Sequence, residues 1–158
     1  MNFQDLCTGN LVRPIPLESR LTHRSNGCVK AYSAGSKSSG KVHPQPFVFL
    51  AKEGFPIKGF SSQVWYVSAE PDALMMDAVI AVFGSAAGEE CAMWQGAPVR
   101  AHWGVEDPAT AAEPEREEAF KLAYIRFGKR AEALPGLPID SMSATELQTT
   151  LNKIGTES

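Results

Sequence analysis

Short apolar runs alternate with helical patterns along this 158-residue chain, and this alternation limits its fold more than any other feature. Residues 29–33 and 78–83 are strand-like apolar runs, residues 99–103 form a weaker one, and the segment before Cys7 completes the set. Strands that alternate with helices predict a parallel sheet with right-handed crossovers. We therefore expect one α/β domain of three layers, in which helices flank a four-stranded parallel sheet.

Helical patterns lie between and after these strands. Residues 46–53 place their apolar side chains on one face, and Gly54 ends the segment. Residues 114–132 carry the strongest pattern, with proline at the start, glutamates in the first turn and basic residues near the end. Its apolar positions are spaced i, i+3, i+4, i+7 and should pack on the sheet: Phe120, Ala123, Tyr124 and Phe127.

A capping box at residues 143–146 predicts a last, short helix. Leu147, Leu151 and Ile154 would bury its apolar face either on the domain body or on a second subunit, and the sequence leaves the oligomeric state open. We assign residues 1–133 to the main domain and residues 134–158 to a C-terminal extension, whose helix we place on the same domain.

The composition and charge exclude several kinds of partner. A content of 44% apolar and 21% charged residues is that of one ordinary domain with a proper core. A net charge of −3 without a basic cluster argues against nucleic acid and anionic membranes as partners. Three cysteines without a CxxC pair or a His/Cys cluster predict neither a disulfide framework nor a metal site. Without a leader or a run of about 18 apolar residues, the chain is expected to be cytoplasmic, where its cysteines stay reduced.

The segment from Cys7 to Arg13 carries the strongest sign of chemistry. Its bend, favoured by glycine and asparagine, would turn successive backbone N–H groups toward one anion. Thiols at such positions titrate at roughly 3.5 to 7.5 rather than about 8.5, so we expect Cys7 to be an ionised nucleophile at neutral pH. Arg13 would add bidentate donors for a tetrahedral oxyanion. The predicted oxyanion-binding residues are Thr8, Gly9, Asn10, Leu11, Val12 and Arg13.

The order of the strands brings an acid to the same place. Cys7 follows the first strand, Ser33 ends the second, Gly84 follows the third and Asp107 lies beyond the fourth. In a parallel sheet these carboxyl ends share one edge, where ligands bind. Asp107 is then a candidate proton donor, and Ser33 could support the anion loop by hydrogen bonds. The Asp107-Pro108 pair is also typical of a turn in which the aspartate caps its own loop.

Further motifs occur downstream, in an order and at separations that are typical of one protein family. They are AYSAGS at residues 31–36, AAGE at 86–89, Cys91, and HWGVEDPA at 102–109. With these motifs the chain resembles the arsenate reductases built on the low-molecular-weight protein tyrosine phosphatase fold. The resemblance is good over residues 30–108, continues to residue 131, and is weakest over residues 1–27.

The resemblance implies a role for each candidate residue. It makes Cys7 the nucleophile that attacks arsenic or phosphorus, Arg13 the oxyanion clamp and Asp107 the general acid that protonates the leaving oxygen. It implies no bound cofactor. The electrons would come from an external thiol, such as glutathione, mycothiol, thioredoxin or glutaredoxin, so a small oxyanion and a thiol-redox partner are expected.

Several residues depart from the family pattern. Pro14 replaces the hydroxyl residue that follows the arginine, Leu11 replaces a small polar residue, and Phe83 occupies the place of the first resolving cysteine. Cys91 aligns with the last resolving cysteine. Either Cys91 or an external thiol would therefore resolve Cys7, or reduction is no longer performed.

The first strand and the remaining cysteine add further expectations. Gln4 and Asp5 interrupt what should be the continuous apolar run of a buried parallel strand, which indicates a short, irregular strand or a remodelled end. Cys28 is expected to pack as a small hydrophobe. His102 and Trp103 are expected to form the packed scaffold of the acid loop.

Three functions fit these residues. The first is arsenate reduction. The second is phosphomonoester hydrolysis through a cysteinyl-phosphate, although Ala109 and Thr110 stand where phosphatases of this fold carry aromatic residues that grip phosphotyrosine. The third is that of a non-catalytic descendant that binds oxyanions or a protein partner.

Overall fold

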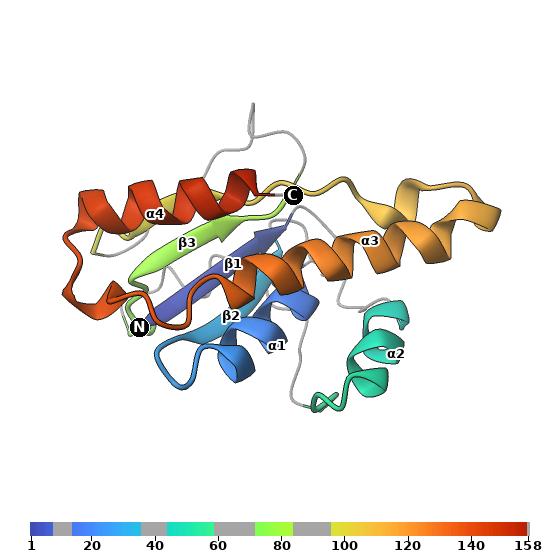
Figure 1. Cartoon of the computed structure of the whole chain (residues 1–158), viewed down its shortest axis with the longest axis horizontal. Coiled ribbons are helices and arrows are strands. Elements are labelled where there is room, and N and C mark those ends of the chain that lie inside the picture. The colour runs from blue at the N-terminus through green and yellow to red at the C-terminus, as the bar shows by residue number, and fades with distance from the viewer. Residues whose placement is uncertain (8–13, 36–43, 59–71, 84–95, 158) are drawn as a thin grey trace.

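The chain forms one parallel sheet of four strands, as the sequence predicts (Figure 1). The computed structural model describes residues 1–7, 14–35, 44–58, 72–83 and 96–157. The strands are β1 (Asn2–Cys7), β2 (Lys30–Gly35), β3 (Ala78–Ala81) and β4 (Val99–His102). Their order is β2-β1-β3-β4, so β1 is paired on both sides.

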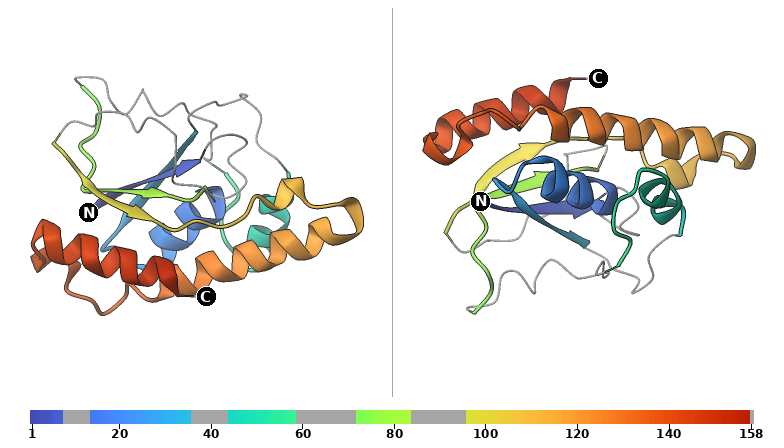
Figure 2. Two further views of the ribbon diagram at one scale, coloured as in Figure 1. Left: turned by 90° about the horizontal axis from the view of Figure 1, so that it is seen from above. Right: turned by 60° about the horizontal axis from the view of Figure 1, so that its bottom comes forward.

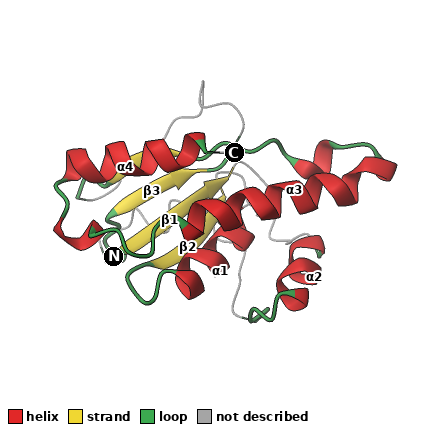
Figure 3. Ribbon diagram, in the orientation of Figure 1, coloured by secondary structure: helices red, strands yellow, loops and turns green. Residues whose placement is uncertain are grey.

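Among the described residues, four helices accompany the sheet (Figure 3). They are α1 (Pro14–Arg24), α2 (Gln45–Lys52), α3 (Glu113–Glu132) and α4 (Ala144–Thr156), with short 3-10 turns at η2 (Pro108–Thr110) and η3 (Ile139–Ser141). The expected helices over residues 46–53 and 114–132 are confirmed, each beginning one residue earlier. None of the helices in the described ranges is long and apolar enough to span a lipid bilayer.

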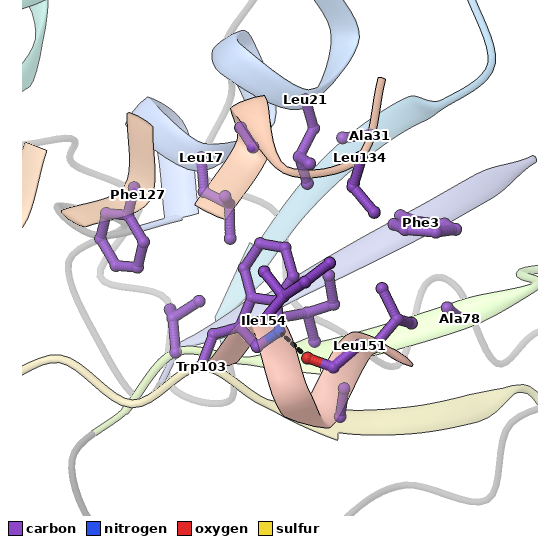
Figure 4. Close-up of a cluster of buried hydrophobic side chains, with 14 of the residues drawn as sticks. Phe3, Leu17, Leu21, Ala31, Ala78, Trp103, Phe127, Leu134, Leu151 and Ile154 are labelled. Atoms are coloured by element: carbon purple, nitrogen blue, oxygen red, sulfur yellow. Dashed lines mark hydrogen bonds between the residues drawn. The ribbon is translucent and has the colours of Figure 1, made fainter. Parts of the chain in front are cut away.

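Helices α1, α3 and α4 pack on the same face of the sheet, with α3 and α4 along one side (Figure 2). Between them lies the main core, in which side chains of all four strands meet those of the three helices (Figure 4). Its largest fully buried members include Trp103, Phe3, Phe127, Leu17, Leu21, Ile80 and Leu151. The opposite face of the sheet carries a smaller apolar cluster, which consists of Leu6, Ala34, Met76, Val79 and Phe83.

The strand β1 is regular, so the expectation of a short and irregular first strand is wrong. All of its residues from Asn2 to Cys7 pair with β2. Successive side chains alternate between the two faces. Phe3 and Cys7 belong to the main core, whereas Leu6 packs on the opposite face. Gln4 is buried but donates its side-chain amide to the carbonyl of Tyr32 at 2.9 Å, which reduces the cost of its burial.

The C-terminal helix α4 packs on the domain body rather than presenting its apolar face to a second subunit. The predicted capping box is present, with Ser143 and Glu146 bonded reciprocally. Leu147, Leu151 and Ile154 are all buried in the main core. The division of the chain at residue 133 stays a prediction.

Candidate active site

The carboxyl ends of the four parallel strands lie at one edge of the sheet, and two of the predicted catalytic residues are found there. Cys7 is the last residue of β1 and is paired with Gly35, the last residue of β2. It is only 3% exposed and forms no disulfide. Asp107 follows β4 and precedes η2. The predicted loop residues 8–12, Arg13, Gly84 and Cys91 lie outside the described residues.

Asp107 caps its own loop, as one of the two sequence readings proposed. Its Oδ1 accepts a hydrogen bond from the backbone N–H of Ala109 at 3.0 Å, and Pro108 begins the 3-10 turn. The hydroxyl of Thr110 donates to the backbone carbonyl of Asp107 at 2.7 Å. These bonds fix the carboxyl group within its own turn, at the start of η2. Proton donation by the same carboxyl stays a prediction.

The segment between β4 and Asp107 is anchored to the end of β3. The backbone N–H of Trp103 donates to the carbonyl of Ala81 at 2.8 Å, and that of Val105 donates to the carbonyl of Val82 at 3.2 Å. The Nε2 atom of His102 lies 2.7 Å from the carbonyl oxygen of Phe83, and Trp103 is fully buried. The predicted scaffold role of His102 and Trp103 is therefore confirmed.

Phe83 stands where a resolving cysteine was expected from the family pattern. Its side chain is 8% exposed and packs with Leu6, Ala34 and Val79 on the face of the sheet opposite to the main core. This position therefore offers a packed aromatic ring and no sulfur.

A pair of carboxyl groups lies between β1 and α1. Asp5 is fully buried, and neither of its carboxyl oxygens has a hydrogen-bond partner. Burial and, to a lesser extent, the nearby charge of Glu18 hold the pKa of Asp5 well above its usual range. Burial also raises the pKa of Glu18, while hydrogen bonds from the side chain and backbone of Ser33 oppose the rise. Ser33 is the β2 partner of Asp5, so the three residues form one cluster.

Sequence reasoning found only part of this cluster. Asp5 was conspicuous as a polar residue in an apolar strand, and Ser33 was expected to support the anion loop. Glu18 was missed because its partner lies on a neighbouring strand rather than in its own helix. The available signal was a glutamate on the same helix face as Leu21, three residues later, which is fully buried.

Cys28 is exposed, so the prediction that it packs as a small hydrophobe is wrong. It follows a turn in which Asn26 and Gly27 have φ angles of 53° and 84°, and this turn brings it to the surface before β2. Its carbonyl accepts a hydrogen bond from the amino group of Met1 at 2.7 Å. Cys28 thus lies at the edge of the sheet opposite to Cys7.

No group of three or more His, Cys, Asp or Glu residues in the part of the chain that the structure describes could hold a metal ion. The candidate site consists, among described residues, of a sulfur, a capping carboxylate, the buried carboxyl group of Asp5 and the half-buried one of Glu18.

Comparison with known proteins places this arrangement in a family. The model of the low molecular weight phosphotyrosine protein phosphatases matches residues 4–135. The arsenate reductase of Bacillus licheniformis is 32% identical over 128 residues, which cover 79% of this chain and 88% of that protein. A solved arsenate reductase in its oxidized state superimposes with a TM-score of 0.67 at 22% identity, covering 84% of this chain and 95% of the other.

A second solved structure extends the comparison of folds. The thioredoxin-dependent arsenate reductase of Corynebacterium glutamicum superimposes with a TM-score of 0.55 at 19% identity, covering 84% of this chain and 61% of the other. At these identities the two superpositions establish the shared fold, while the family match spans most of the chain. The chain therefore belongs to the low molecular weight phosphotyrosine protein phosphatase family.

Proposed function

We propose that this protein is an arsenate reductase that uses Cys7 as its nucleophile. The observation that carries the proposal is that Cys7 is the last residue of β1 and that Asp107 follows β4, so both lie toward the carboxyl ends of the parallel strands. The arsenate reductase of Bacillus licheniformis, at 32% identity, supports the choice of substrate.

In the proposed reaction the thiolate of Cys7 attacks the arsenic of bound arsenate. A sulfur–arsenic bond forms and an arsenic–oxygen bond breaks, while Asp107 gives its proton to the departing oxygen. Arg13 and the amides of residues 8–12 would neutralise the charge on the remaining oxygens.

A second thiol completes the reduction. It attacks the sulfur of Cys7, so that a disulfide forms and the electron pair of the sulfur–arsenic bond leaves with arsenic as arsenite. Arsenic gains two electrons and the two sulfurs lose them. Because Phe83 replaces the first resolving cysteine, the second thiol is either Cys91 or the thiol of a small molecule or another protein. The similarity of the fold to a thioredoxin-dependent arsenate reductase favours thioredoxin among the protein thiols.

The competing proposal is hydrolysis of phosphomonoesters through a cysteinyl-phosphate. Membership of a phosphatase family favours it. The residues after Pro108 are Ala109 and Thr110, which offer no aromatic ring to a phosphotyrosine side chain. We therefore rank reduction first, and a non-catalytic oxyanion-binding role third.

One set of assays separates these functions. Arsenite formation is measured with arsenate and, in turn, glutathione, mycothiol or thioredoxin, for the wild type and for Cys7→Ser. A reductase requires both the thiol and Cys7. Turnover of p-nitrophenyl phosphate without added thiol identifies a phosphatase, and the absence of both activities with retained binding of phosphate identifies the non-catalytic alternative.

A further inference from the structure

A cavity of about 380 Å³ lies where the segment after β4 meets α3 and the end of α4 (Figure 1). It is lined by His102 and residues 104–106, by Arg126 of α3, and by residues 155–156 of α4. Neither Cys7 nor Asp107 belongs to its wall. Its volume is in the range of sites that hold small molecules.

Two arginines of α3 bring positive charge to this cavity. Arg126 lines it, is exposed, and forms no hydrogen bond or ion pair with any residue that the structure describes. Arg130, one helical turn later, is only 5% exposed. It donates to the backbone carbonyls of Trp103 at 2.9 Å and of Glu157 at 3.3 Å, each the sequence neighbour of a residue that lines the cavity. The guanidinium group of Arg130 therefore lies next to the cavity wall.

The charge of this arginine pair is not neutralised within the described part of the chain. Glu106, in the wall, and Glu157, after α4, are both exposed, and neither forms an ion pair with Arg126 or Arg130. The carbonyl end of α4 supplies only about half a negative charge. Burial and, to a lesser extent, the charge of Arg126 lower the pKa of Arg130. A buried cation beside a second cation is unfavourable unless an anion compensates it.

We propose that this cavity binds a doubly charged oxyanion of the phosphate class, either free or carried by a small organic molecule. The planar guanidinium group of Arg126 would donate two parallel hydrogen bonds to two oxygens of the anion. Arg126 can turn toward a ligand without breaking a bond to a described residue, while Arg130 adds its charge from behind the wall. The site is additional to the predicted anion loop and does not depend on the proposed reaction.

The test is isothermal titration calorimetry of the full chain with inorganic phosphate and with glycerol phosphate, at an ionic strength held constant by sodium chloride. Arg126→Gln removes the charge that lines the cavity. Lys121→Gln is the matched control, because Lys121 is an exposed cation of the same helix that pairs with Glu118 at 3.9 Å and does not line this cavity. Arg13→Ala removes the arginine of the predicted anion loop and so identifies phosphate bound there.

We expect the wild type to bind two phosphate ions, of which Arg126→Gln loses one and Arg13→Ala loses the other. The loss of charge-assisted hydrogen bonds should weaken the Arg126 site by roughly 10- to 100-fold, whereas Lys121→Gln should keep both sites. Tighter binding of glycerol phosphate than of inorganic phosphate at the Arg126 site identifies an ester as its ligand. The reverse order identifies a free ion.

The proposal would be overturned if the wild type bound a single phosphate that Arg13→Ala abolishes, or if Arg126→Gln still bound two. Equal heat on addition of sodium chloride alone would also overturn it, because the effect would then be ionic screening. One phosphate that depends on Arg126 and not on Arg13 would support this site and contradict the anion loop of the proposed function.

The stability of the variant provides a separate check. In phosphate-free buffer Arg126→Gln should unfold at or above the wild-type thermal midpoint, because the change removes the repulsion of Arg130 and no bond to a described residue. Added phosphate should then raise the midpoint of the wild type more than that of Arg126→Gln. A lower midpoint of the variant in phosphate-free buffer would show that Arg126 has a structural partner and would refute the site.

Discussion

The indole N–H of Trp103 donates to the backbone carbonyl of Leu151 at 2.7 Å, and both residues are fully buried (Figure 4). This bond ties the segment that follows β4 to α4. Arg130 of α3 adds a second tie, because its Nη1 donates to the carbonyl of Trp103 at 2.9 Å. The strand end that leads to Asp107 is therefore held by both C-terminal helices.

We predict that Gly155→Ala destabilises the protein, although alanine favours a helix by about 1 kcal/mol over glycine. A Cβ atom at Gly155 would lie 2.5 Å from the carbonyl oxygen of His102 and 2.6 Å from Cδ1 of Trp103. Such overpacking costs about 1 to 3 kcal/mol. Urea denaturation measures the change. Asn152→Ala, on an exposed position of the same helix, should instead stabilise slightly, and a Gly155→Ala protein as stable as that control would contradict the described packing of α4.

We predict that Asp5→Asn and Asp5→Leu stabilise the protein at neutral pH. The pKa of Asp5 is raised in the folded state, so above about pH 4 the folded chain keeps a proton that the unfolded chain has released. The free energy of unfolding of the wild type therefore falls as pH rises from about 4 toward the folded-state pKa, by up to about 1.4 kcal/mol per pH unit from this group.

The measurement is thermal or urea unfolding over that pH interval. Both Asp5 variants should show a shallower loss of stability with pH than the wild type. Asp72→Asn, at an exposed turn, is the control and should keep the wild-type slope. Equal slopes in the wild type and the Asp5 variants would mean that the buried carboxyl is ionised at all these pH values.

We predict that Asp107→Asn lowers the rate of arsenite formation by about 100- to 10,000-fold, because it removes the proton that the leaving oxygen needs. Asparagine can still accept the hydrogen bond from Ala109, so the thermal midpoint should change little. Asp107→Ala should lower the rate of arsenite formation and also the thermal midpoint, because alanine cannot accept the hydrogen bond from Ala109. Wild-type turnover by Asp107→Asn would restrict Asp107 to its structural role.

We predict that Ser143→Ala costs about 0.5 to 2 kcal/mol of stability, through the loss of the N-cap of α4. Hydrogen bonds from the backbone and side chain of Ser143 lower the pKa of Glu146 in the folded state. The stabilisation from Glu146 is therefore present above the unfolded-state pKa, near about 4.3, and is lost as pH falls through the lower folded-state value. The acid limb of an unfolding curve should be less steep in Glu146→Gln, which removes the titrating group, and an unchanged limb there would argue against the hydrogen bond from the backbone N–H of Ser143 to Glu146.

Local patterns predicted most of the fold, because periodicity and caps depend on neighbours in sequence. Phe120, Tyr124 and Phe127 are buried as their spacing requires, and the capping box at Ser143 starts α4. The bounds of the strands differ by only a few residues from those expected.

Features that depend on distant contacts could not be predicted in the same way. Asp5 sits in a regular strand because β2 and β3 pair with it on both sides. The pairing of Glu18 with Ser33 joins a helix to a strand, and the exposure of Cys28 follows from the turn at Asn26 and Gly27. Within the candidate site, the sequence identified Cys7 and Asp107 but not the carboxyl pair.

The central place of β1 has a consequence for synthesis on the ribosome. This strand emerges first, yet its two partners are complete only once Gly35 and Ala81 have been made. A nascent apolar strand that waits with open edges can pair with other chains. Because a charged carboxylate and a polar amide within an apolar stretch oppose such pairing, we expect Asp5 and Gln4 to lower the tendency of the unfolded strand to aggregate. The burial of the Asp5 carboxyl group thus lowers the stability of the folded sheet, whereas its charge opposes aggregation of the same strand before folding.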